Sequence, residues 1–375
     1  MEMNQIYQIT NTVVNETVGD SVLVNEDLSN IVDVGTAIFN ASAFDAYVRS
    51  LVNHIGRMVF VNRPYRGSAP SVLMDSWEYG SVMEKVTATL PTAVENESWE
   101  LTDGTSYDPN IFYKPDVSAK FFNKRTTFEI DRSITERQVK QSFSSPTQLN
   151  SFISMLFNEV EKAMTIRTDA LIMRTINNMT AETINTANSN RAINLLTEYN
   201  TAFSQSLTAA QAILTPEFIR YAAYRMGITI GRLSRASTLF NEGGLVRFTP
   251  RDLLHIVMLD EFATAADVYL QSDTFHNEYT RLAEAERVPY WQGSGTGFAF
   301  ADTSKIDVST ASGNTVSQSG ILAVMFDRDA LGVTNYDRRV TTNYNAKAEF
   351  TNYFYKQDCG YFNDFNENFV TFYVA

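Results

Sequence analysis

The feature that most constrains the fold is a long helical pattern between Pro146 and Asn185. No Gly or Pro interrupts residues 147–185, and Ser144 or Ser145 can cap the first turn, where a proline is favourable. Apolar side chains recur at near-helical spacing at Leu149, Phe152, Ile153, Leu156, Val160, Ala163, Met164, Ala170, Leu171 and Ile176. Such a helix spans up to ~60 Å, several times the usual length of ~12 residues. The pattern therefore predicts a structural spine.

After this helix, helical and strand patterns alternate in a way that is typical of an α/β domain. The expected elements are a helix over 215–234, a strand over 253–259, a helix over 262–285 and, after a Ser/Thr-rich stretch, a strand over 321–326. Residues 340–375 return to strand patterns. The fold class that these segments indicate is α+β.

Two segments carry little helical period and are expected to reach outside the body of the protein. Residues 1–35 are polar and rich in Asn, Thr and Val, and we interpret them as an extended arm. Residues 80–122 contain three prolines and short β-prone runs, with Trp99 opening a strand that enters a turn at Gly104. Long segments of this kind are usually functional or disordered. We expect a two-stranded excursion that lies on a neighbouring subunit, and a helix over 43–59 between the two segments.

The charge balance is acidic and argues against a dedicated nucleic-acid binder. The chain has 30 Lys and Arg against 43 Asp and Glu, a net charge of −13. The longest basic clusters, Lys124-Arg125 and Arg338-Arg339, are two residues long, whereas gripping phosphates requires many cations that displace counterions. A protein that lies beside nucleic acid without binding it tightly remains compatible with this balance.

The cysteine content and the N-terminal segment favour a protein that is located in the reducing interior of a cell. Cys359 is the single cysteine, so an intrachain disulfide cannot form. The N-terminal segment lacks the basic and apolar regions of a signal peptide, and no window approaches ~18 apolar residues without charge. We expect the protein to be soluble and intracellular where it is made, with no membrane contact.

Motifs for catalysis, cofactors and metals are missing from the sequence. The three histidines are widely separated, and neither HExxH nor CxxC occurs. The glycine run Gly293–Gly297 lacks the Lys-Ser/Thr of a phosphate loop and does not lead into a helix. GxSxG is absent, and Cys359 has no nearby His that could activate a thiolate. We therefore predict no catalytic, cofactor-binding or metal site.

Two charged clusters, Asp327-Arg328-Asp329 and Asp337-Arg338-Arg339, follow the apolar strand and leave two interpretations open. Carboxylates at the end of a buried strand are a common place for acid–base chemistry in α/β enzymes. Each Asp here has an Arg beside it, however, which favours ionised and mutually neutralised groups. Such pairs matter most when they are desolvated between subunits, where losing one partner costs ~2–5 kcal/mol. We favour subunit contacts for both clusters.

In kind and in order, these parts resemble the major capsid proteins of tailed bacteriophages (Caudoviricetes) with the Hong Kong 97-like fold. The resemblance covers nearly the whole chain and is carried by VPYWQGSG (288–295), ILAVMFDRDALGV (321–333) and DRRVTTNYNAKAEFTNYFYK (337–356). It implies an N-terminal arm, an E-loop, a peripheral domain with the spine helix, and an axial α/β domain. The implied arm is residues 1–42, and the implied E-loop is residues 80–122. The peripheral domain would contain residues 43–79, residues 123–200 with the spine helix at 146–185, and return strands at 320–360. The axial domain would contain residues 201–319 and a final strand at 361–375.

The resemblance implies a structural protein and not an enzyme. Its copies would form the hexamers and pentamers of an icosahedral shell in the virion, assembled in the host cytoplasm around double-stranded DNA without sequence-specific binding. Implied partners are scaffolding, portal and decoration proteins. Some relatives crosslink an E-loop lysine to a neighbour, which makes Lys85 and Lys114 candidates, while Trp99 is the expected aromatic anchor of the E-loop. The second charged cluster would lie near contacts between capsomers.

Two other interpretations stay open at this point. Another virion structural protein, such as a tail-tube or portal-associated component, would share the composition, but tubes are mostly β and lack a forty-residue helix. An intracellular α/β enzyme would place its carboxylates at the end of strand 321–326, in a deep pocket around Asp327 and Asp329.

Overall fold

In the computed structural model, the chain divides into two compact units. The first contains Met1–Glu78, Arg125–Ile172 and Thr334–Gly360, and the second contains Tyr79–Lys124, Met173–Val333 and Tyr361–Ala375. The structure describes residues 3–19, 23–26, 29–40, 43, 46, 47, 49–51, 54, 69–74, 83–88, 90, 91, 93–142, 145–271, 285–292, 297–310 and 313–375.

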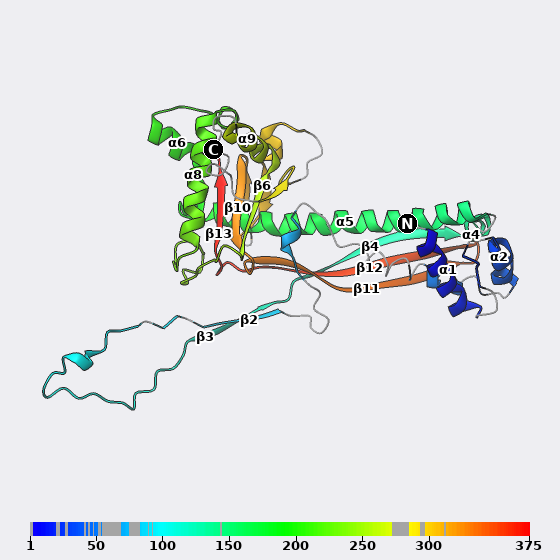
Figure 1. Ribbon diagram of the computed structural model, residues 1–375, viewed down its shortest axis with the longest axis horizontal. Helices are drawn as coiled ribbons and strands as arrows, with labels where there is room; N and C mark the ends of the chain where they lie inside the picture. Colours follow the sequence, from blue (N-terminus) through cyan, green and yellow to red (C-terminus); the bar gives the residue numbers. More distant parts are fainter. Residues whose placement is uncertain are drawn as a thin grey trace. The chain divides into compact units, whose positions relative to one another are not determined.

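The first unit is built on a four-stranded sheet in the order β1-β11-β12-β4 (Figure 1). Strand β12 (Phe350–Asn363) pairs antiparallel with β4 (Arg125–Thr135) over eleven consecutive residue pairs. The long strand β11 (Leu331–Asn345) lies on the other side of β12, and the short β1 (Leu73–Met74) follows it. Helix η2 (Pro70–Val72) comes directly before β1 in the chain, and helix α4 (Glu136–Ser142) comes directly after β4.

Helix α5 (Pro146–Asn185) has the bounds that the sequence predicts and is 40 residues long. The part of α5 in the first unit buries one face. The buried residues Leu149, Ile153, Leu156 and Val160 recur every three or four residues, which places them on the same side of the helix. The part that belongs to the second unit is buried on nearly all sides, polar residues included. Its buried residues are Met173, Thr175, Ile176, Asn177, Met179, Thr180, Ala181 and Thr183.

The extended conformation predicted for residues 1–35 is wrong, because the segment forms helix α1 (Met3–Thr17) and enters helix α2 (Ile31–Asn40). Both helices contribute to the hydrophobic core of the first unit, together with residues of α4, α5, β4 and β12. The Asn and Thr content that argued against a helix is a weak preference, which burial of an apolar face overrides. The buried residues of α1 and α2 include Ile9, Val13, Val14, Ile31, Val34 and Ile38.

The second unit contains a five-stranded sheet in the order β5-β13-β10-β6-β7. Strand β10 (Ile321–Asp327) is buried along its whole length and pairs antiparallel with both β13 (Phe369–Tyr373) and β6 (Leu254–Leu259). The edges are parallel: β5 (Ala192–Asn194) pairs with β13, and β7 (Glu286–Val288) pairs with β6. Because β10 pairs with β6, the predicted domain boundary at 319/320 falls inside this unit.

Four helices accompany this sheet, and Figure 1 shows the sheet beside α8 and α9. A full capping box begins α7, and Pro216 occupies the first turn of α8, as the sequence predicts. The buried Trp291 donates from Nε1 to the carbonyl of Ile321 at 2.8 Å and so fixes the start of β10. The helices are α6 (Leu195–Phe203), α7 (Ala209–Ile213), α8 (Pro216–Leu233) and α9 (Asp260–Gln271).

Smaller elements complete the second unit. They are helix α10 (Phe300–Thr303), the antiparallel pair β8 (Ile306–Ser309) and β9 (Thr315–Gln318), and the short helix η3 (Glu97–Trp99). The helix predicted from residue 262 is observed as α9, and its predicted continuation over 272–284 lies outside the described residues. So do most of the predicted helix over 43–59 and residues 293–296 of the glycine run.

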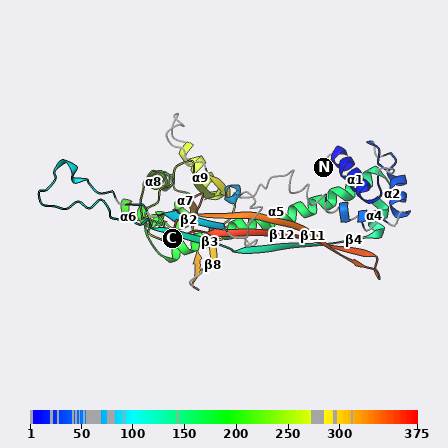
Figure 2. The same ribbon diagram turned by 90° about the horizontal axis from the view of Figure 1, so that it is seen from below.

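The predicted two-stranded excursion is an antiparallel hairpin in the second unit. Strand β2 (Met83–Ala88) pairs with β3 (Val117–Phe122), from Met83–Phe122 to Ala88–Val117. Residues 89–116 are here called the distal loop, and the described ones among them extend beyond the paired strands (Figures 1 and 2).

Candidate functional site at the root of the hairpin

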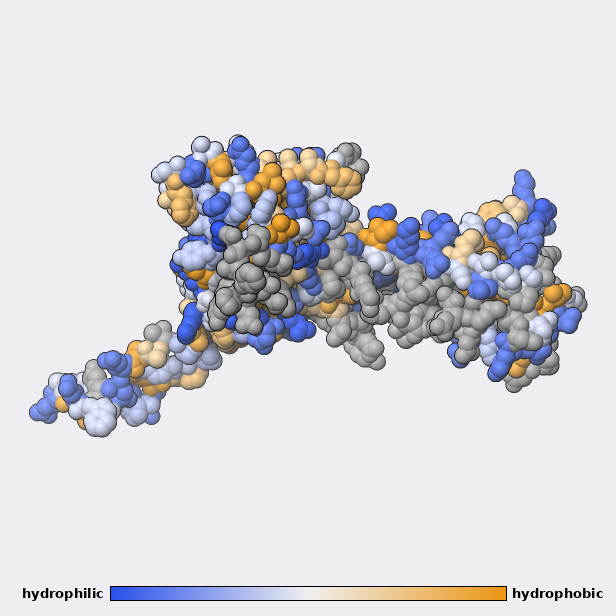
Figure 3. Space-filling model, turned by 45° about the horizontal axis from the view of Figure 1, so that its top comes forward, coloured by the Kyte–Doolittle hydropathy of each residue, from blue (hydrophilic) through white to orange (hydrophobic). Residues whose placement is uncertain are grey.

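The hairpin exposes an unusual number of large apolar side chains. Trp99 in η3 is 95% exposed, the highest value among the large hydrophobic residues of the described chain. In Figure 3 the projecting hairpin shows hydrophobic and hydrophilic residues side by side. Exposed apolar surface of this extent, mixed with polar groups, marks an interaction site. The exposed residues are Val86, Leu90, Val94, Trp99, Leu101, Tyr107, Ile111, Phe112, Tyr113, Val117 and Phe121.

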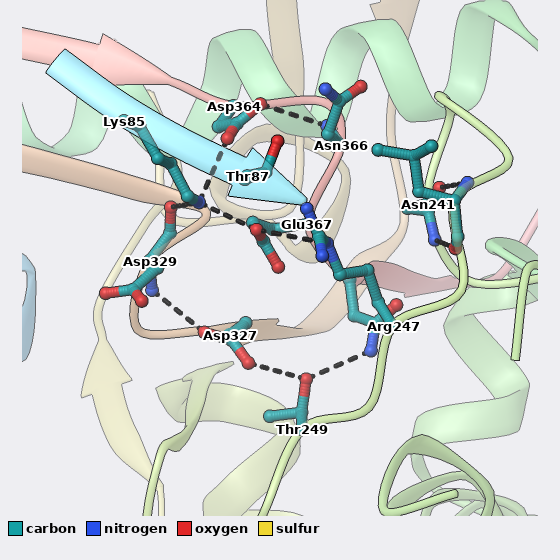
Figure 4. Close-up of polar contacts among 12 residues, drawn as sticks. Lys85, Thr87, Asn241, Arg247, Thr249, Asp327, Asp329, Asp364, Asn366 and Glu367 are labelled. Atoms are coloured by element: carbon teal, nitrogen blue, oxygen red, sulfur yellow. Dashed lines mark hydrogen bonds and ion pairs between the residues drawn. The ribbon is translucent and has the colours of Figure 1, made fainter. Parts of the chain in front are cut away.

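At its root, the hairpin is fastened to the rest of the second unit by ion pairs (Figure 4). The ammonium of Lys85 on β2 lies 3.0 Å from Asp364 Oδ2 and 2.7 Å from Glu367 Oε1. It also donates to the backbone carbonyl of Asp329 at 3.3 Å. Lys120 on β3 donates to Asp364 Oδ1 at 2.8 Å, so each strand of the hairpin contributes one cation to the same carboxylate.

A third cation completes the arrangement. Arg247 Nε lies 3.3 Å from Glu367 Oε1, so each of the two carboxylates contacts two cations. We refer to Lys85, Lys120, Arg247, Asp364 and Glu367 as the root cluster.

Burial sets the electrostatics of the root cluster. The Asp364 side chain is 1% exposed, which alone would raise its pKa, but the hydrogen bond from Lys120 and the charge of Lys85 lower the pKa below its usual value. Burial would likewise lower the pKa of Lys85, but its hydrogen bond to Glu367 and the charges of both carboxylates raise it. Burial raises the pKa of Glu367, and the hydrogen bond and charge of Lys85 only partly offset this rise. The contacts within the root cluster therefore favour the charged forms of Lys85 and Asp364, whose side chains are 15% and 1% exposed.

Asp327 has a structural role and is not an accessible catalytic carboxylate. Its side chain accepts hydrogen bonds from Thr249 Oγ1 at 2.7 Å and from the backbone N–H of Asp329 at 3.0 Å. Thr249 in turn accepts from Asn368 Nδ2 at 3.0 Å. The residue is 6% exposed, so both its hydrogen bonds and its burial fit a group that closes the turn after β10. Asp329 and Arg328 are exposed, and Arg328 donates its backbone N–H to Leu253.

The second charged cluster lies on β11 in the first unit. Arg339 pairs with Asp358 of β12, with Nη1 2.5 Å from Oδ2, and this hydrogen bond lowers the pKa of Asp358. The Arg338 side chain is half-buried, and burial lowers the pKa of its guanidinium. Neighbouring residues of a strand point to opposite faces, so the two arginines have different surroundings. The side chain of Asp337 lies outside the described residues.

The structure brings one predicted residue, Lys85, into the root cluster, whereas Trp99 and Lys114 lie exposed in the distal loop. The other cluster members could not be found from the sequence, since single charges in segments such as FNDFNENF carry no local signature. Lys120 and Asp364 are 244 residues apart along the chain, and Lys85 and Glu367 are 282 apart.

Two absences apply to the described part of the chain. None of its helices is both long and apolar enough to cross a membrane. Nor does that part contain a group of three or more His, Cys, Asp or Glu side chains that could hold a metal ion.

Comparison with solved structures finds capsids of tailed phages. A chain of the capsid of Staphylococcus phage Andhra has 11% identity and a TM-score of 0.49, with 81% of this chain and 83% of that chain covered. A chain from the structure of the head fiber and inner core protein gp22 of native bacteriophage P68 has 8% identity and a TM-score of 0.50, with 84% and 86% covered. The capsid of cyanophage P-SCSP1u gives 10% identity and a TM-score of 0.45, with 81% and 86% covered.

Sequence comparison gives the decisive result. No curated protein matches the chain at a significant level. The family described as Phi29-like phage major capsid protein, by contrast, matches residues 8–373, which is nearly the whole chain. The chain therefore belongs to the Phi29-like phage major capsid protein family and is a capsid-forming structural protein of a virion.

Proposed function

We propose that copies of this chain form the hexamers and pentamers of an icosahedral shell that encloses double-stranded DNA, with the hairpin of each copy lying across a neighbour. The observation that carries this proposal is the combination of a buried ionic root with an exposed apolar distal loop. A hairpin fastened at its base presents its apolar side chains at little further entropic cost, which favours binding. Many such contacts around a closed shell add up through avidity.

We further propose a Hong Kong 97-like organisation for the chain. In it, residues 80–122 are the E-loop and residues 43–79, 123–200 and 334–360 the peripheral domain. The axial domain is residues 201–333 and 361–375, because β10 pairs with β6 and so belongs with the five-stranded sheet. The division into two units supports a two-domain organisation, although helices α1 and α2 make residues 1–42 part of a packed core as well as an arm.

The acidic balance supports a shell that encloses DNA without gripping it. With a net charge of −13, the chain has no excess of cations to displace counterions from phosphates. The proposed role requires no catalysis. Assembly in the host cytoplasm, with scaffolding, portal and decoration proteins as partners, is part of the same proposal.

Electron microscopy of the purified chain, alone and together with its genomic neighbours, tests this function. We expect shells, capsomers or sheets with hexameric order. A chain that stays monomeric in every condition would contradict the proposal. The variant Lys85→Met separates an effect on assembly from an effect on folding. It should weaken the root of the hairpin and reduce the yield of shells, while the circular dichroism spectrum of the subunit stays unchanged.

A further inference from the structure

A cavity of about 330 Å³ opens beside the root of the hairpin. We call it the root pocket. Four parts of the second unit line it: the end of β3 with Phe121 and Lys124, one face of α5 with Arg174 and Asn178, the β8 end, and the segment around Tyr361 and Phe365. Its volume is at the small end of the range of ~300–1,000 Å³ for ligand sites, so it suits one large side chain better than a helix or a strand.

The lining of the root pocket is rich in aromatic rings, and its two cations outnumber its one carboxylate, Glu182. The rings of Phe122 and Phe362 lie 5.2 Å apart between centroids, and the guanidinium of Arg174 lies 5.6 Å from the ring centroid of Tyr361. An arginine over an aromatic ring presents a flat surface on which a further ring can stack. Lys124 and Arg174 are both exposed.

The distal loop has the complementary chemistry. Residues 89–116 contain six carboxylates and one lysine, and Glu95 and Glu100 flank the exposed Trp99. The indole stands on the short helix η3, whose turn is fixed by a hydrogen bond from the Ser98 N–H to Asn96 Oδ1 at 2.8 Å. An aromatic side chain held on a fixed turn and flanked by acids matches a pocket lined by aromatic rings, with two cations against one carboxylate.

We propose that the root pocket receives the Trp99 side chain of a second copy of this chain, so that the tip of one hairpin is held at the root of the next. This inference rests on the proposed function, since it requires neighbouring copies. The eleven residues that follow Ala88 and end at Trp99 reach at most ~40 Å when extended, which is the distance over which the copies would overlap. A tip-to-root contact is heterologous, and in a closed ring each copy gives one tip and receives one.

Photo-crosslinking from position 99 tests the contact in assembled shells. Trp99 is replaced by p-benzoylphenylalanine, and shells are made from a mixture of ¹⁴N- and ¹⁵N-labelled protein so that crosslinks between copies can be recognised by mass. We expect crosslinks between copies to residues 121–124, 174–182 or 361–365. The same probe at Phe203, an exposed position on α6, is the control and should not give them. Crosslinks from position 99 to other segments, to another virion protein or within one copy would overturn the inference.

A pair of variants tests the contact without the probe. Trp99→Ala should raise the protein concentration needed for shell formation roughly thirtyfold, the effect of losing a hot-spot side chain. Asn178→Trp, which fills the root pocket from within, should have a similar effect, and the double variant should be no worse than either, because both remove one contact. Additive effects would contradict the inference.

Two controls separate the possible failures. The thermal midpoint of the unassembled subunit should be unchanged in both single variants. If the wild-type chain forms no shells, the proposed function fails; if it forms shells and Trp99→Ala forms them equally well, only the tip-to-root contact fails.

Discussion

The root cluster gives a quantitative prediction for Lys85→Met. Methionine is unbranched and keeps most of the side-chain length, but it removes the charge that lies 3.0 Å from Asp364 and 2.7 Å from Glu367. Breaking a buried ion pair costs ~3–5 kcal/mol, because a buried charge is left without compensation. Here Lys120 still contacts Asp364, and Arg247 still contacts Glu367. We therefore expect a smaller loss, about 2–3 kcal/mol, for the docking of the hairpin root.

Hydrogen exchange of the unassembled subunit measures this loss. If β2 and β3 exchange by local opening, a loss of about 2–3 kcal/mol should accelerate the exchange of their paired amides by about 30–150-fold. Amides of the five-stranded sheet should be unaffected. Lys114→Met is the matched control, since it removes an exposed lysine from the distal loop of the same hairpin. A difference of less than about threefold between the two variants would refute the view that the root cluster fastens the hairpin.

Three further predictions concern the cores of the two units. Burial raises the pKa of Cys359 to about 12, so iodoacetamide at about pH 9 should modify it only after unfolding; rapid labelling of the native protein would be inconsistent with this burial. The hydrogen bond from Arg225 lowers the pKa of Glu198. The ion pair therefore stabilises the fold above about pH 4.3, and this stabilisation is lost as the pH falls further. We expect Glu198→Gln to show a smaller drop in Tm between about pH 5 and pH 3 than the wild type. Trp291→Phe removes a buried indole donor and should cost about 1–3 kcal/mol in denaturant unfolding, whereas Trp99→Phe, at an exposed site, should change stability by less than about 0.5 kcal/mol.

Sequence reasoning was accurate where a pattern is local and continuous. Helix α5 follows from forty residues without an internal Gly or Pro, and the hairpin follows from a long irregular segment bounded by β-prone runs. It was wrong about the conformation of residues 1–35, because the apolar spacing of Ile9, Val13 and Val14 is diluted by Asn and Thr. Thr12 and Thr17 satisfy their hydroxyls by donating to carbonyls of their own helix, which removes the objection that their polarity raised.

The candidate site could be predicted only in part, because its partners meet through the fold. Lys85 drew attention as a lysine of the excursion, yet nothing in the sequence connects it with Glu367, which is 282 residues away. The acidic and basic residues of the charged cluster on β11 were expected to neutralise each other and to contact other subunits, and the second expectation stays a prediction. Arg339 instead pairs across the sheet with Asp358, because consecutive strand residues point to opposite faces and cannot easily meet each other.

The core of the first unit has a consequence for the timing of folding. It joins Ile9 and Val13, near the beginning of the chain, to Tyr353 and Tyr355, near its end. At a synthesis rate of about 5–20 residues per second, the N-terminal helices wait roughly 20–70 s on the ribosome before their last partners are made. During that interval their apolar faces lack part of their native cover. The core of the first unit is therefore completed only after β12 has been synthesised and has left the ribosome.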